Sequence, residues 1–107
     1  MKILKMDKMI GGWFVGDFEP TAYRTKDFEV CYKFHPKGEV WPKHYHEKSV
    51  EINYLIRGTM TIQNTNLAPG DIFVLDRGEI ADPIFLEDCE IIVVKTPSAP
   101  DDKVVIE

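Results

Sequence analysis

The chain has 107 residues and a mass of 12.3 kDa, which fits a single domain over residues 1–107. Hydrophobic residues make up 44% and charged residues 29% of the sequence, as in globular proteins and unlike disordered or fibrous ones. Thirteen basic against eighteen acidic residues give a formal net charge of −5. That balance argues against nucleic acid and membrane surfaces as partners, because both attract clustered lysine and arginine.

The N-terminal stretch "MKILKMDKMIGGW" is not typical of a secretory signal, because Asp7 and Lys8 interrupt its apolar residues. The longest purely aliphatic run, residues 91–94, is far shorter than the roughly 20 residues that a membrane helix needs. A cytoplasmic location is therefore expected. Cys31 and Cys89 show no CxxC spacing, and in that compartment they are expected to be buried, reduced thiols.

The first clear strand pattern covers residues 28–35, where apolar side chains alternate with mostly charged ones. The apolar set, expected to form the one apolar face of the strand, is Phe28, Val30, Tyr32 and Phe34. His35 falls in the other set, so it is expected to face solvent and not to bind metal. Further strands are predicted over residues 52–58, 59–62, 71–75 and 90–95, with a turn at 64–66. The last two strands are nearly continuous apolar runs, which predicts that both of their faces are covered.

Glycine and proline recur at short intervals, from Gly11 and Gly12 to Pro97, and separate these strands. Strands that are this short and this closely spaced indicate an all-β sandwich or barrel. No internal repeat, low-complexity segment or linker divides the chain.

Two of the three histidines lie two positions apart in "GEVWPKHYHEKSVEINYLIRG", residues 38–58. On a strand, His44 and His46 project from the same face, and Tyr45 points away from them. Glu51 follows a short turn and can enter from the neighbouring strand. Two imidazoles and a carboxylate that converge in this way form a suitable ligand set for a divalent transition metal. The alternative is that the histidines are polar barrel-lining residues that hydrogen-bond Glu51 and water without metal.

This stretch resembles the complete first signature motif of the cupin superfamily. The matching spacing is Gly38, five residues, His44, one residue, His46, four residues, Glu51, six residues, Gly58. For a small single-domain cupin, this resemblance implies a double-stranded β-helix, that is, a jelly-roll barrel. It also implies that His44, His46 and Glu51 are metal ligands inside the barrel. Iron, manganese, nickel and zinc all suit such ligands, so the residues do not identify the metal.

The second cupin motif is only partly present. Gly70 and Gly78 have the separation of its two glycines, but Asp76 stands at the proline position and Ala81 at the position of the fourth metal ligand, a histidine. Asp82 is the neighbouring carboxylate, and a bulge at Pro83 would be needed to turn it inward, because a shift of one residue moves a side chain to the opposite face. Asp82 is therefore a candidate fourth ligand, or a base beside the metal.

Two main functions remain open. The first is a metal-dependent enzyme acting on a small organic molecule, with oxygenase or isomerase chemistry, since cupins span such reactions. The second is a sensor or binding barrel that holds a small ligand or metal without turnover, which the missing histidine favours. A metal-free accessory barrel is a third, weaker alternative.

The two ends of the chain carry apolar segments, residues 13–15 and 104–106. An open jelly-roll sheet leaves strand edges that need to be paired or covered. Pairing two copies would bury both segments, so a homodimer is expected. The aromatic residues are expected in the core or at this interface rather than in a substrate cage.

Overall fold

The computed structural model describes residues 1–106, and β-strands make up nearly all of its regular structure. The single helical element is the short 3-10 helix η1, Met6–Lys8, within these residues. The strands are β1 (Trp13–Val15), β2 (Glu29–His35), β3 (His44–His46), β4 (Val50–Arg57), β5 (Met60–Ile62), β6 (Thr65–Leu67), β7 (Ile72–Leu75), β8 (Ile84–Phe85), β9 (Cys89–Thr96) and β10 (Lys103–Val105). The predicted all-β class is confirmed.

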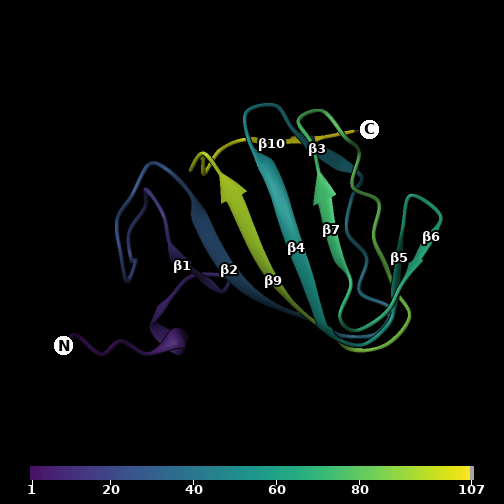
Figure 1. The fold of residues 1–107 in the computed structure, drawn as a ribbon, viewed down its shortest axis with the longest axis horizontal. Coiled ribbons are helices and arrows are strands. Elements are labelled where there is room, and N and C mark those ends of the chain that lie inside the picture. Colours follow the sequence, from purple (N-terminus) through teal and green to yellow (C-terminus); the bar gives the residue numbers. More distant parts are fainter. Residues whose placement is uncertain (107) are drawn as a thin grey trace.

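Three antiparallel sheets make up the structure. The largest has five strands in the order β1-β2-β9-β4-β7, and the others are β10-β3 and β6-β5-β8. Figure 1 shows β2, β9, β4 and β7 side by side, with β10 and β3 near one end of them. A bridge between His44 and Ala81 and another between Val40 and Ile84 connect the small sheets to the segments around them. Both terminal segments that were expected to support a dimer are strands within this chain, because β1 pairs with β2 and β10 with β3.

The five-stranded sheet turns its more polar face inward. On β2, Glu29, Cys31 and His35 are buried, while Phe34 is 48% exposed. The predicted apolar face of this strand is thus not the face that is buried, and the prediction that His35 faces solvent is wrong. The physical reason lies in the partner strand, where Lys95 of β9 stands opposite Glu29 and neutralises it.

The outer face of the same sheet is apolar. Strand register aligns two outer rows across four strands: Val30–Val94–Ile52–Val74 and Tyr32–Ile92–Tyr54–Ile72. Their side chains are half-buried or exposed, and Ile72 reaches 69% exposure. The expectation that both faces are covered is therefore wrong for residues 71–75, where Ile72 and Val74 are exposed, whereas the outer side chains of residues 90–95 are half-buried.

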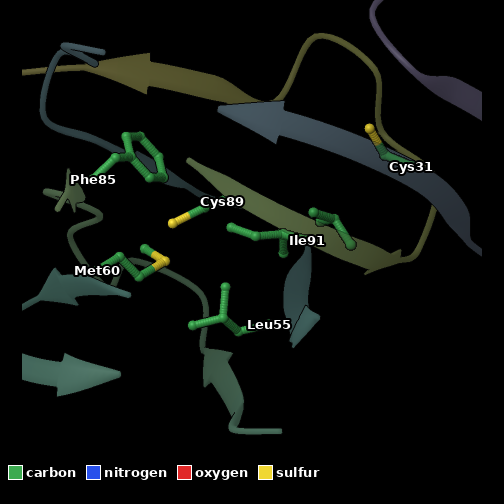
Figure 2. Close-up of a cluster of buried hydrophobic side chains, with 7 residues drawn as sticks. Cys31, Leu55, Met60, Phe85, Cys89 and Ile91 are labelled. Carbon is green, nitrogen blue, oxygen red and sulfur yellow. The ribbon is translucent and has the colours of Figure 1, made fainter. Parts of the chain in front are cut away.

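The apolar core lies at one end of the barrel interior. In Figure 2, Leu55, Met60, Phe85, Cys89 and Ile91 surround a common centre, and Cys31 lies apart from them. Both cysteines are fully buried and free, as predicted, and burial raises the pKa of the Cys31 thiol to about 12.

The segment that follows β9 returns to the barrel and holds the loop between β3 and β4. Asp102 accepts hydrogen bonds from the backbone N–H groups of Glu47, Lys48 and Ser49 at 3.0, 2.8 and 2.9 Å. Burial alone would raise the pKa of Asp102, but these three N–H groups lower it below the usual value. No helix among residues 1–106 has the length and hydropathy to span a membrane.

Candidate functional site

A cavity of about 420 Å³ lies inside the barrel, and it is lined by residues from all three sheets. One part of its wall is apolar and includes Met60, Ile62, Phe85 and Ile91. Another part is polar and includes His44, His46 and Glu51, so all three predicted metal ligands line the same cavity.

His44 and His46 form an adjacent pair on β3. Both are buried, and their rings meet edge to face with centroids 5.4 Å apart. His44 Nδ1 lies 3.0 Å from the carbonyl oxygen of Pro42. Because a carbonyl only accepts hydrogen bonds, Nδ1 carries the proton, and in the neutral imidazole Nε2 keeps its lone pair. A backbone hydrogen bond that fixes the tautomer in this way is typical of metal-binding histidines.

The electrostatics of the site favour neutral side chains. Burial, with added repulsion from Lys95 and His44, lowers the pKa of His46 to about 4, so this imidazole is neutral at pH 7. Burial raises the pKa of Glu51, and the hydrogen bond from Asn53 opposes that shift. Asn53 Nδ2 donates to Glu51 Oε2 at 3.3 Å, from two positions along β4.

The structure brings the two imidazoles together but does not close the predicted triad around one point. Within residues 1–106, no group of three His, Cys, Asp or Glu side chains is arranged to hold a metal ion. The donor chemistry nevertheless fits a divalent transition metal, because the wall offers a tautomer-fixed imidazole, a neutral imidazole and a carboxylate.

Asp82 does not reach this cavity. Its carboxylate accepts a hydrogen bond from the backbone N–H of Gln63 at 2.8 Å, beside the turn between β5 and β6. Ala81 lines the cavity instead, and it is held there by reciprocal backbone hydrogen bonds with His44 at 3.1 and 2.7 Å. The chain keeps the register that puts residue 81 inward, so the predicted roles of Asp82 as a ligand or base have no structural support.

Several polar residues of the cavity wall were missed in the sequence. Lys33, Lys95, Glu29 and His35 enter from β2 and β9, and Lys103 enters from β10. For the three residues of β2, the signal was the alternation along residues 28–35, which predicts two faces but does not tell which face points inward.

His35 is held more firmly than its predicted surface position implied. Its Nδ1 lies 2.7 Å from Glu39 Oε1, and its ring stacks on Phe85 with centroids 4.2 Å apart. Glu39 also accepts a hydrogen bond from the indole N–H of Trp41. These contacts fix the orientation of an imidazole that lines the cavity.

Comparison with known proteins identifies the fold. No protein-family model and no curated protein matches the sequence. Among solved structures, KdgF from Halomonas sp. is 27% identical over 72% of this chain and 74% of its own, with a TM-score of 0.64. A double-stranded β-helix protein from Klebsiella pneumoniae is 20% identical, over 78% of this chain and 73% of its own, with a TM-score of 0.69. A cupin-2 domain protein from Shewanella frigidimarina is 20% identical, over 67% and 72%, with a TM-score of 0.54.

Proposed function

We propose that this chain binds a divalent transition metal through His44, His46 and Glu51. A small organic molecule would be its substrate beside the metal. The proposal proceeds from the fold, a small cupin with a double-stranded β-helix barrel. The observation that carries this proposal is the His44–His46 pair, with the proton of His44 fixed on Nδ1 by Pro42. Glu51 would complete the set by exchanging its hydrogen bond with Asn53 for the metal.

A bound divalent metal would supply a Lewis acid with open coordination positions. The chain itself supplies the other requirements. The apolar wall offers contacts to an organic substrate, and His35, oriented by Glu39, is available to hold or move a proton at Nε2. This is the enzyme form of the proposal.

The alternative is a binding or sensor barrel without turnover. The observation that favours it is the methyl group of Ala81, which lines the cavity at the position of the fourth ligand. A site with fewer protein ligands holds its metal less tightly, which suits reversible binding as well as catalysis.

The test is elemental analysis of protein purified from metal-supplemented medium. We expect close to one divalent transition-metal ion per chain in the wild type, and its loss in His44→Ala and in His46→Ala. Glu51→Gln should weaken metal binding and leave the fold intact, because Glu51 lies outside the apolar core.

Two variants serve as controls. His35→Gln removes the third histidine of the same cavity, and Asp82→Ala removes the carboxylate beside Gln63, so both should keep the metal. A wild-type protein that contains no transition metal, or equal metal loss in His35→Gln and His44→Ala, would reject the site.

A further inference from the structure

Two lysines line the cavity without a carboxylate partner. Lys33 is half-buried on β2, and Lys103 is an exposed residue of β10, which places it at the cavity opening. Lys103 stands opposite His46 in the β3–β10 register, so both side chains leave the same face of that sheet. Among residues 1–106, Lys95 has a carboxylate within ion-pair distance, whereas Lys33 and Lys103 do not.

The two ammonium groups meet at one indole ring. Lys103 Nζ lies 4.4 Å from the centroid of the Trp41 ring, and Lys33 Nζ lies 5.9 Å from the same ring. Lys33 Nζ also donates to the carbonyl oxygen of Gly11 at 2.5 Å. An ammonium has three donors, and neither an aromatic ring nor a carbonyl neutralises its charge. Both lysines therefore keep positive charge available at the wall.

The charge of this wall differs from that of the molecule. The protein has a formal net charge of −5, and the cavity is lined by three lysines and by three glutamates, Glu19, Glu29 and Glu51. Glu29 neutralises Lys95 and Glu19 pairs with Arg24, which leaves Lys33 and Lys103 against the half-buried carboxylate of Glu51. Burial, with repulsion from Lys33, lowers the pKa of Lys103, and the charge of Glu51 opposes that shift. An anion placed between the lysines would relieve that repulsion.

We infer that Lys33 and Lys103, beside Trp41, bind the carboxylate of a small organic acid whose apolar body occupies the part of the cavity lined by Met60, Ile62, Phe85 and Ile91. The inference names the ligand class of the cavity and rests on the proposed function for its use as a small-molecule site. A carboxylate fits better than a phosphate, because no arginine is among the lining residues and most of the lining is apolar. The cavity volume of about 420 Å³ suits a single-ring or short-chain acid.

Isothermal titration calorimetry on chelator-treated and on zinc-loaded full-length protein tests this inference. The probes are benzoate, hexanoate and succinate, with benzamide as the neutral counterpart of benzoate and inorganic phosphate as a second anion. We expect saturable binding of benzoate or hexanoate, no binding of benzamide, and weaker binding of phosphate. Lys33→Met and Lys103→Met should each weaken carboxylate binding about tenfold or more, since a hydrogen bond to a charged group is lost.

Methionine keeps the apolar stem of lysine, so these variants change the charge with little change in shape. Lys103→Arg keeps the charge and should keep binding, while Lys43→Met removes an exposed lysine that does not line the cavity and should have no effect. Circular dichroism checks that each variant is folded. Equal affinity in wild type and in the Lys33→Met/Lys103→Met variant, tighter binding of phosphate than of every carboxylate, or no saturable carboxylate binding would overturn the inference.

Metal content measured on the same samples separates the two proposals. Lysine-dependent carboxylate binding by a protein that takes up no zinc would support the inference and reject the metal site. Zinc uptake without lysine-dependent carboxylate binding would support the metal site and reject the inference about the lysines.

Discussion

Lys95 and Glu29 form the most deeply buried ion pair among residues 1–106. Their side chains are 6% and 2% exposed, and Lys95 Nζ lies 3.1 Å from Glu29 Oε1. Ser98 Oγ donates to the other Glu29 oxygen at 3.0 Å, which satisfies more of that carboxylate. A buried pair of this kind adds little net stability, but each charge depends on the other to remain buried.

Lys95→Met should therefore destabilise the protein by about 3 kcal/mol or more, because it leaves the Glu29 charge buried without a partner. The double variant Lys95→Met/Glu29→Met should recover much of that loss, since it removes both charges and keeps the volume. The free energies of unfolding come from urea denaturation monitored by tryptophan fluorescence. Equal stability of the single and double variants would mean that the pair is not coupled.

At the scale of the elements, two glycines of the first cupin motif occupy turns. One is required for its backbone conformation alone, and the other also for lack of space. Gly58 and Gly38 both have positive φ, at 86° and 80°. A side chain at Gly58 would also meet the backbone carbonyl of Asp88, whereas one at Gly38 would meet nothing within 4 Å. Gly38→Ala isolates the backbone strain, and Gly58→Ala adds a steric clash to it.

We expect Gly38→Ala to lower the free energy of unfolding by about 1 kcal/mol, the cost of a left-handed non-glycine residue. Gly58→Ala should cost at least about 2 kcal/mol more, because the chain at Asp88 has to move. Urea denaturation of both variants gives the comparison. Equal losses would show that the contact with Asp88 relaxes freely.

The sequence predicts the longer strands but not the orientation of the large sheet, and the turn predicted at 64–66 is wrong in its position, because strand β6 already begins at Thr65. Residues 28–35, 71–75 and 90–95 all contain strands, and the motif spacing brings His44, His46 and Glu51 to one cavity. Alternation fixes which side chains share a face, whereas the inward direction depends on pairing between distant strands. The buried positions of Lys95 and His35 depend on that pairing, so local patterns could not predict them.

At the scale of the whole molecule, the outer rows of the five-stranded sheet predict a homodimer. Its interface would be the outer face of this sheet and not the terminal segments 13–15 and 104–106. The rows place eight apolar or aromatic side chains together across β2, β9, β4 and β7. Monomers rarely expose an apolar surface of this extent, and a two-fold axis would let the rows cover one another.

Light scattering at micromolar concentration should give about twice the chain mass of 12.3 kDa. Ile52→Lys, in the centre of an outer row, should yield a monomer, because a lysine on each copy would be buried against the other. Val40→Lys introduces the same charge at an 89% exposed position outside the strands and should leave the dimer intact. A wild-type monomer at millimolar concentration would contradict this prediction.

The five-stranded sheet has its more polar face inside and its apolar face outside, and this arrangement also affects how the chain folds. During collapse, both faces of the sheet offer apolar rows, so hydrophobic burial alone does not separate the native barrel from one turned inside out. Such ambiguity is energetic frustration, and the pairing of Glu29 with Lys95 resolves only part of it. Association would resolve more, because it removes water from the outer rows only in the native orientation. In the predicted dimer, the uniqueness of the fold would belong to the assembled pair, and its apparent stability would rise with protein concentration.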